Sequence, residues 1–223
     1  MQDLIFETQD GSHSILSQQY GVSYHSKYGA VQESRHVFIE AGLYHQTSEQ
    51  KNRSVLEFGF GSGLNALLTL LEAERHGWHI RYETLEAYPI LLEQVRQLNY
   101  PARLDATDFA PAFLQMHACP PNLWQPLSPH FTFRKLITRF EDAILAADSF
   151  DIVYFDAFAP GAQPDLWDTA TLGKAYEALR PGGILVTYCA KGSVKRTLKS
   201  LGFVVEALPG PPGKREMTRA FKP

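Results

Sequence analysis

Four acidic side chains and a run of glycines stand where apolar, β-like segments end. The segment 54–58 contains Glu57 and leads directly into Gly59, Gly61 and Gly63. Three further acids, Glu86, Asp142 and Asp156, come at or just after the ends of later β-like segments. In open α/β sheets, ligands bind beyond the carboxyl ends of the strands. The sequence therefore predicts a ligand site at one edge of a sheet.

The glycine run predicts what this ligand is. Glycine lets the backbone turn sharply and approach a ligand closely. The spacing of Gly59, Gly61 and Gly63 is G-x-G-x-G, whereas dinucleotide sites favour G-x-G-x-x-G; Gly61, Gly63 and Ala66 fit a looser version of that pattern. The extra Gly59 and the preceding Glu57 favour S-adenosylmethionine, because an acid beside the loop can receive its methionine ammonium. NAD and a ligand-free turn remain alternatives.

Two acids are candidates for the nucleoside part of the ligand. Glu86 lies 23 residues beyond Gly63, a distance at which an acid hydrogen-bonds ribose hydroxyls, and Ala87 follows it. Glu83 is the competing choice, but it lies earlier in the predicted strand. Asp142 is a candidate acceptor for the exocyclic amine of adenine, or else a helix N-cap.

Asp156 and Phe158 follow the apolar segment 150–155 and suit the methylation of an amine. A carboxylate can orient an amine and stabilise the positive charge that develops on it, and an aromatic face next to a cation adds about 0.5–2 kcal/mol. Catalysis would come mainly from the alignment of donor and acceptor. In the alternative interpretation, Asp156 caps a loop and Phe158 belongs to the core.

The elements that must position these residues alternate between strand and helix. Strands are expected at 54–58, 80–85, 131–138, 150–155, 184–189, 203–208 and 217–221, and helices at 31–42, 64–76, 90–98, 108–116, 168–179 and 193–201, with a Pro-rich loop at 119–130. This order predicts an α/β, doubly wound, Rossmann-like sheet. The short link after residue 208 makes the last of seven strands antiparallel, which is the architecture of class I S-adenosylmethionine-dependent methyltransferases. Residues 1–50, with a hairpin at 4–18, are expected to form an extension over the donor site, and 51–223 the methyltransferase domain.

Composition excludes several other classes of protein. The 223 residues are 44% hydrophobic and 20% charged, as in a globular protein, and no stretch approaches the roughly 18 apolar residues of a membrane span. No signal peptide is visible, Cys119 and Cys189 form no disulfide framework, and no metal-site spacing appears, so a cytoplasmic protein is expected. Net charge is −3, yet residues 174–223 hold 10 Lys/Arg against 3 Asp/Glu. This basic quarter is either a phosphate-facing surface or a set of solvated faces.

Four stretches together resemble a known family. They are 24–39, 56–65, 155–167 and 213–217, with the sequences YHSKYGAVQESRHVFI, LEFGFGSGLN, FDAFAPGAQPDLW and GKREM. In matching order they resemble the tRNA 5-methylaminomethyl-2-thiouridine methyltransferase family, which comprises the MnmC N-terminal domain and the stand-alone MnmD type. The resemblance implies methyl transfer from S-adenosylmethionine to 5-aminomethyl-2-thiouridine at the tRNA wobble position. It implies the methylation step only, without a flavin oxidoreductase domain; a separate oxidoreductase that supplies the aminomethyl group is an open partner.

The resemblance also assigns roles to residues. Gly59, Phe60, Gly61, Gly63 and Asn65 would line the donor, and Tyr24, Ser26, Glu33 and Ser34 would close over it. The proton acceptor is open between Asp156, Glu33 and His25. An anticodon stem-loop would be held by Lys191, Lys195, Arg196, Lys199, Lys214 and Arg215. Trp124 or Phe158 would stack on the wobble base, unless Trp124 is a loop anchor.

Three rival functions fit parts of these observations. A small-molecule amine methyltransferase needs no basic face. A non-catalytic nucleotide-binding module would bind NAD. A polyamine synthase would use the same sheet with a decarboxylated donor.

Overall fold

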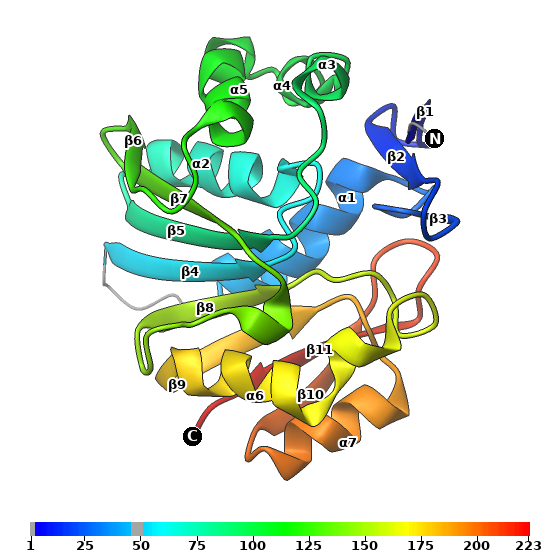
Figure 1. The fold of residues 1–223 in the computed structure, drawn as a ribbon, viewed down its shortest axis with the longest axis vertical. Coiled ribbons are helices and arrows are strands. Elements are labelled where there is room, and N and C mark those ends of the chain that lie inside the picture. The colour runs from blue at the N-terminus through cyan, green and yellow to red at the C-terminus, as the bar shows by residue number, and fades with distance from the viewer. Residues whose placement is uncertain (1–2, 46–50) are drawn as a thin grey trace.

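An eight-stranded sheet forms the centre of the computed structural model, which describes residues 3–45 and 51–223 (Figure 1). Its strand order is β10-β11-β9-β8-β4-β5-β7-β6. The strands are β4 (Asn52–Phe58), β5 (His79–Glu86), β6 (Gln125–Ser128), β7 (Phe131–Ile137), β8 (Phe150–Phe155), β9 (Leu179–Thr187), β10 (Val204–Pro209) and β11 (Glu216–Phe221). β11 runs antiparallel to both β9 and β10, and β6 runs antiparallel to β7, so the other six strands are parallel to one another.

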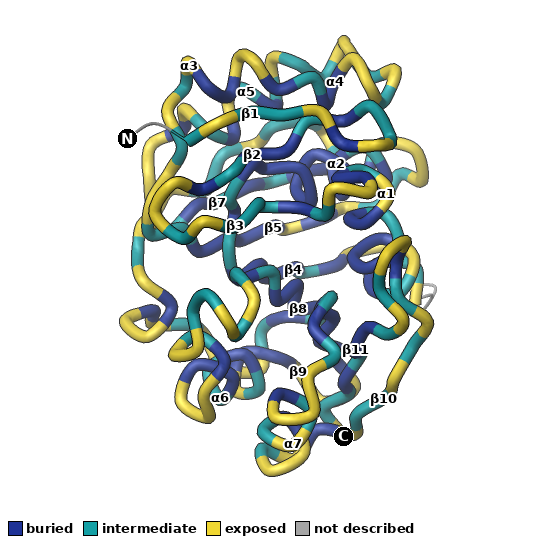
Figure 2. Tube along the Cα trace, turned by 90° about the vertical axis from the view of Figure 1, so that its right-hand side faces the viewer, coloured by how far each residue is buried: buried dark blue, intermediate teal, exposed yellow. Residues whose placement is uncertain are grey.

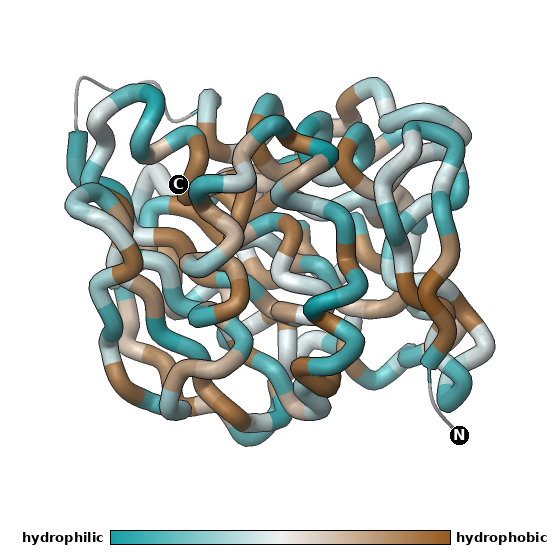
Figure 3. The backbone as a smooth tube through the Cα atoms, turned by 90° about the horizontal axis from the view of Figure 1, so that it is seen from above, coloured by the Kyte–Doolittle hydropathy of each residue, from teal (hydrophilic) through white to brown (hydrophobic). Residues whose placement is uncertain are grey.

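Helices cover both faces of this sheet. They are α1 (Ala30–Ser34), α2 (Leu64–His76), α3 (Leu92–Val95), α4 (Tyr100–Arg103), α5 (Ala110–Ala118), α6 (Thr169–Ala178) and α7 (Gly192–Ser200). Successive strand residues point to opposite faces. Accordingly, Tyr154 of β8 joins an apolar cluster with α2, whereas its neighbour Phe155 joins a second cluster with α6 and α7. Figure 2 shows the buried strands β4 and β8 between these layers, and Figure 3 shows hydrophilic segments around the outside.

A small N-terminal sheet stands beside the main one. Its strands are β1 (Leu4–Glu7), β2 (His13–Ser17) and β3 (Val22–Ser23), all antiparallel. Asp10 in the first turn accepts hydrogen bonds from the backbone of Ser12 and of Gln32, and thereby ties this sheet to α1. Figure 1 shows the loop between β10 and β11 next to the same sheet. The N-terminal sheet and the loop between β10 and β11 therefore lie on the same side of the molecule.

The prediction of a doubly wound sheet with an antiparallel last strand is confirmed, but the count of seven strands is wrong. The predicted loop at 119–130 contains β6, an edge strand in which Pro126 is tolerated because an edge position needs fewer ladder bonds. The helix predicted at 31–42 begins as α1 and continues as the π-helix η1 (Arg35–Leu43). The helix predicted at 90–98 shrinks to α3. Three 3-10 turns, η2 (Thr107–Phe109), η3 (Phe140–Asp142) and η4 (Pro164–Trp167), were not expected.

The predicted boundary between residues 50 and 51 touches residues 46–50, which lie outside the described residues. In the described ranges 3–45 and 51–223, no helix has the length and apolar character that a membrane crossing requires.

Candidate active site

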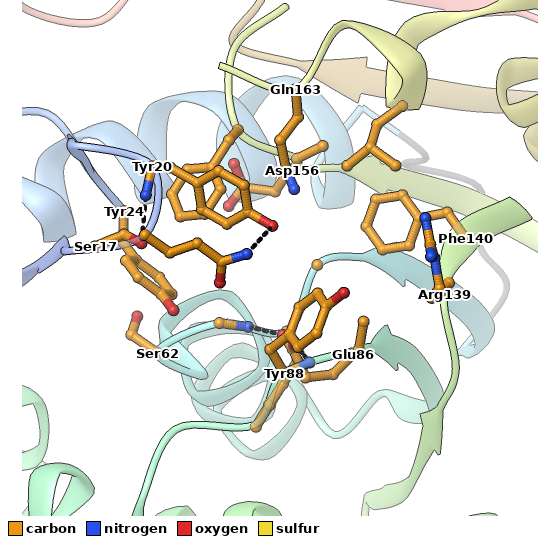
Figure 4. Close-up of a pocket in the computed structure, with 18 of the residues that line it drawn as sticks. Ser17, Tyr20, Tyr24, Ser62, Glu86, Tyr88, Arg139, Phe140, Asp156 and Gln163 are labelled. Carbon is orange, nitrogen blue, oxygen red and sulfur yellow. Dashed lines mark hydrogen bonds between the residues drawn. The ribbon is translucent and has the colours of Figure 1, made fainter. Parts of the chain in front are cut away.

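A cavity opens at the carboxyl ends of β4, β5 and β8 (Figure 4). Its wall comes from the glycine loop after β4, the ends of β5 and β8, the turn η3, the loop after β8, and the N-terminal segment around β3. The lining residues are Asp3, Ser17, Gln19, Tyr20, Tyr24, His25, Gly59, Phe60, Gly61, Ser62, Leu64, Asn65, Glu86, Ala87, Tyr88, Arg139, Phe140, Glu141, Asp156, Ala157, Phe158, Gln163 and Leu166. The predicted edge site is thus formed by segments from across the sequence.

Two glycines shape the floor of the cavity. Gly59 has φ +95°, and a Cβ there would lie 2.6 Å from the carbonyl oxygen of Asp156. A Cβ on Gly61, at φ +51°, would lie 3.0 Å from the ring of Tyr24. Gly63 has a different role: it is the left-handed N-cap of α2 and is buried outside the lining, against His117. A side chain at Gly59 or Gly61 would therefore collide with neighbouring parts of the protein, and both glycines line the cavity with backbone alone.

Glu86 occupies the place expected of a ribose-binding acid. Its two carboxylate oxygens accept hydrogen bonds from the backbone N–H of Gly61, at 2.8 Å, and of Tyr88, at 2.7 Å. Burial raises the pKa of this carboxyl group. These bonds fix the carboxylate at the cavity wall and leave further lone pairs for hydroxyl donors. The competing Glu83 instead pairs with Arg134 and lies outside the lining.

Glu57 does not reach the cavity, so its prediction as a ligand contact is wrong. Its side chain is fully buried; Oε1 accepts from Asn65 Nδ2 at 3.1 Å and Oε2 accepts from the Thr84 hydroxyl at 2.8 Å. Burial raises the pKa of Glu57 well above its usual value. Neighbouring strand residues alternate in direction, so Glu57 projects beneath the loop toward α2.

Asn65 takes the place that Glu57 was expected to fill. It lines the cavity, and its Nδ2 also donates to Asp156 Oδ2 at 2.8 Å. Its Oδ1 is buried and has no hydrogen-bond partner among the described residues. A buried acceptor without a partner is unusual. It fits a donor group on a ligand, such as the ammonium of S-adenosylmethionine, and a nucleoside fits beside Glu86.

Asp156 directly follows the last residue of β8 and lines the cavity. Its backbone N–H donates to the Phe58 carbonyl at 2.9 Å, which fixes the loop at the end of β8. Burial, reinforced by the negative charge of Glu33, raises the pKa of Asp156 to about 7, although the hydrogen bond from Asn65 and the charge of Lys214 oppose this shift. The carboxyl group can therefore hold or release a proton near neutral pH.

Phe158 lies against two tyrosines of the N-terminal segment. The centroid of its ring is 5.1 Å from that of Tyr20 and 5.1 Å from that of Tyr24. The Phe158 carbonyl accepts a hydrogen bond from the Trp167 indole at 2.8 Å, so the loop after β8 is anchored to η4. Phe158 lines the cavity as predicted.

Glu33 lies behind Asp156 and outside the lining, which contradicts its prediction as a group that touches the donor. Its Oε1 accepts from Lys214 Nζ at 2.6 Å and its Oε2 accepts from the Ser26 backbone N–H at 2.7 Å. The same Nζ lies 3.8 Å from the ring centroid of Tyr188, whose hydroxyl donates to the Ala157 carbonyl. Lys214 is therefore paired with Glu33, and its contact with a phosphate stays a prediction.

Ser26, Ser34 and Asp142 are also absent from the lining, so the cavity gives no support to the donor contacts predicted for them. Ser34 is fully buried, and Asp142 is exposed on η3, where Phe140 and Glu141 line the cavity instead. A short 3-10 turn changes which side chain points inward, and no sequence signal marked that turn.

His25 and Trp124 have structural partners. The Nε2 of His25 lies 2.8 Å from the hydroxyl of Ser62, and burial lowers the pKa of His25 to about 4, which makes it a weak proton acceptor near neutral pH. The guanidinium groups of Arg81 and Arg134 lie 4.2 Å and 4.5 Å from the ring centroid of Trp124, which is outside the lining, and this packing favours the loop-anchor interpretation.

The predicted cations divide into two groups. Lys191, Arg196, Lys199 and Arg215 are exposed, whereas Lys195 pairs with Glu216 at 2.9 Å. Sequence reasoning missed Tyr20, Tyr88, Arg139 and Gln163 as lining residues, because they stand in loops without a recognisable motif.

Comparisons with known proteins agree with this geometry. Residues 132–223 match the family model described as S-adenosyl-L-methionine-dependent methyltransferase. The chain is 28% identical over 235 residues to the tRNA 5-methylaminomethyl-2-thiouridine biosynthesis bifunctional protein MnmC of Burkholderia mallei strain SAVP1, which covers 96% of this chain and 34% of that protein. The chain thus spans about a third of the length of the curated relatives it matches.

Two solved structures share the fold. MNMC2 from Aquifex aeolicus superimposes with a TM-score of 0.80 at 26% identity, over 99% of this chain and 70% of that one. Spermidine synthase from Thermotoga maritima superimposes with a TM-score of 0.52 at 13% identity, over 99% of this chain and 69% of that one, and this likeness concerns the fold alone.

Proposed function

We propose that this chain is an S-adenosyl-L-methionine-dependent methyltransferase of the MnmC type, as its relatives indicate, and that it methylates the primary amine of 5-aminomethyl-2-thiouridine at the tRNA wobble position. The product is 5-methylaminomethyl-2-thiouridine. The observation that carries this proposal is the position of Asp156, held by Asn65 on one side and followed by Phe158 on the other, in a cavity with a glycine floor.

The chain's own residues bind and align the reactants. When bound, S-adenosylmethionine supplies a methyl group on a sulfonium; the amine nitrogen gains this methyl and loses a proton. Asn65 Oδ1 and Glu86 offer acceptors for the ammonium and the ribose of the donor. Asp156 accepts a hydrogen bond from the substrate amine and directs its lone pair, and the ring of Phe158 faces the charge that develops.

Asp156 is also the proposed proton acceptor. With a pKa of about 7, it is sufficiently ionised at neutral pH to take a proton from the amine. His25 is a weaker base, and Glu33 is already bonded to Lys214 and Ser26. The choice left open by the sequence thus falls on Asp156.

The RNA would approach over the exposed cations. Lys191, Arg196 and Lys199 belong to α7 and its N-cap, and Arg215 stands just before β11. Phosphates bind such groups with release of counterions, and a wobble base is single-stranded and can enter a pocket. The aminomethyl group must come from another enzyme or domain, for which a separate oxidoreductase is our proposed partner, and the cytoplasm is the proposed compartment.

The test is the analysis of tRNA nucleosides by mass spectrometry. Undermodified tRNA that carries 5-aminomethyl-2-thiouridine is incubated with the protein and S-adenosylmethionine. We expect a gain of one methyl group at the wobble nucleoside, and a gain that is about 10²-fold slower or more with Asp156→Asn. No methylated nucleoside with the wild-type protein would refute the proposal.

Two further incubations separate the rivals. Equal kcat/KM on the free nucleoside and on tRNA would indicate a small-molecule amine methyltransferase. Aminopropyl transfer from decarboxylated S-adenosylmethionine would indicate a polyamine synthase.

A further inference from the structure

We propose that Tyr20, Phe158 and Gln163 form a binding subsite for the pyrimidine base of the substrate, and that the N-terminal segment thereby selects the acceptor. This inference rests on the proposed function and specifies which part of the cavity receives the RNA.

The cavity has two walls of different chemistry. One wall holds the bare backbone of Gly59 and Gly61 with Glu86, the groups suited to the donor. The opposite wall, on the other side of Asp156, contains Tyr20 from the link between β2 and β3, and Gln163 from the loop after β8 (Figure 4). A methyl group that passes from donor to acceptor must cross between these walls, beside Asp156.

Tyr20 provides an aromatic face at the acceptor wall. Its ring is half-buried and packs at an interplanar angle of 48° against Phe158, and its hydroxyl accepts a hydrogen bond from Gln19 Nε2 at 3.2 Å. Tyr24 meets the same phenylalanine edge-on at 83°. The three rings, contributed by two distant segments, form an aromatic cluster at the cavity. Aromatic side chains bind unstacked bases by stacking on their faces, and this interaction is tolerant of base identity.

Gln163 provides polar recognition. Its side-chain amide lines the cavity, and the structure gives this amide no hydrogen-bond partner among the described residues. The backbone N–H of Gln163 donates to the Ala159 carbonyl at 3.1 Å, which holds the loop in place. A glutamine amide both donates and accepts. The edge of the 2-thiouracil ring presents an N–H beside a carbonyl oxygen, so one glutamine amide can accept from the N–H and donate to the oxygen.

The experiment compares Tyr20→Ala, Tyr20→Phe and Gln163→Ala with the wild-type protein. Two quantities are measured: kcat/KM for tRNA carrying the aminomethyl nucleoside, and the Kd of S-adenosylhomocysteine by calorimetry. We expect Tyr20→Ala and Gln163→Ala each to lower kcat/KM about tenfold or more, through loss of stacking and of the edge contact. Tyr20→Phe keeps the ring and should therefore recover most of the kcat/KM that is lost in Tyr20→Ala. The Kd should change less than twofold in all three.

Other outcomes would overturn the subsite. Unchanged kcat/KM in both alanine variants would show that the base binds elsewhere. An equal loss of S-adenosylhomocysteine affinity would assign these residues to the donor wall. These results can be distinguished from failure of the proposed function, in which the wild-type protein itself leaves tRNA unmethylated. That failure would also refute the proposed subsite.

Discussion

Asp156 combines two properties that rarely occur together in a carboxyl group. It is sheltered enough for its pKa to rise to about 7, yet it lines an accessible cavity. Perturbed pKa values of this kind cluster at functional sites. The sequence predicted Asp156 because an acid directly after a buried strand is visible in the residue pattern.

The pH dependence of the reaction should report this residue. Protonated Asp156 cannot accept a hydrogen bond or a proton from the amine, so kcat/KM for tRNA should fall about tenfold per pH unit below about pH 7. Asp156→Asn should lower kcat by about 10²-fold or more at pH 8 and abolish this acidic limb, while the substrate's own titration persists. An acidic limb with unchanged midpoint and steepness in the variant would assign it to another group.

Glu57 illustrates what residue patterns miss. It stands two positions before Gly59, where an acid beside the ligand was expected, but strand alternation turns it under the loop. The position of Asn65 on the first turn of α2 was visible from the sequence, whereas its unpaired Oδ1 was not. Side-chain direction at the end of a strand depends on the exact strand register, which the sequence leaves open by one residue.

At the scale of elements, the Glu33–Lys214 ion pair joins α1 to the loop between β10 and β11. Glu33 is 6% exposed and the Lys214 side chain is 33% exposed, so the carboxylate depends on this cation for its neutralisation. The two charges also act electrostatically on Asp156: Glu33 raises the pKa of Asp156 and Lys214 lowers it. Both are positioning residues.

Removal of either charge should shift the pH dependence of kcat/KM, and the two shifts should have opposite directions. Lys214→Met leaves a buried charge unpaired and should cost about 1–3 kcal/mol of stability, a figure reduced for the partial exposure of the lysine. It should also move the acidic limb of kcat/KM to higher pH, whereas Glu33→Gln should move it to lower pH. Thermal unfolding and pH profiles measure these effects.

The double variant Glu33→Gln/Lys214→Met is the matched control. It removes both charges, and we expect it to recover most of the stability lost in Lys214→Met. If the two single variants shift the limb in the same direction, the pair does not act on Asp156 electrostatically.

Elements with strong periodicity were predictable, and short or irregular ones were not. The helix at 64–76 and the strand at 150–155 agree residue for residue with α2 and β8, because glycine punctuation and apolar runs define their ends. The π-helical continuation of α1 and the edge strand β6 depend on tertiary packing.

At the scale of the whole molecule, only some of the excess cations in residues 174–223 contribute to an exposed basic surface. Lys195, Lys214 and Arg219 pair with Glu216, Glu33 and Glu206. Lys191, Arg196, Lys199 and Arg215 remain exposed and form the proposed RNA-binding face. Sequence counting gave the excess of cations in this quarter, but it could not say which of them face solvent.

Charge reversal tests this face. Arg196→Glu/Lys199→Glu should weaken tRNA binding and reduce the slope of log K against log salt concentration by about two, since each phosphate contact contributes about 0.9. The Kd of S-adenosylhomocysteine should hold. Arg81→Glu, on the distant β5, is the control and should leave the slope unchanged. An unaltered slope in the α7 variant would place the RNA on another face.

The order β10-β11-β9 has a consequence for how the chain folds while it is being synthesised. β11 fits between two strands that precede it in the chain, and the loop just before it carries Lys214. During translation, β9 and β10 leave the ribosome first and must keep a gap open, or separate again, until residues 216–221 emerge. A nascent chain halted before that point would expose two unpaired strand edges, so we expect such intermediates to be preferred clients of chaperones.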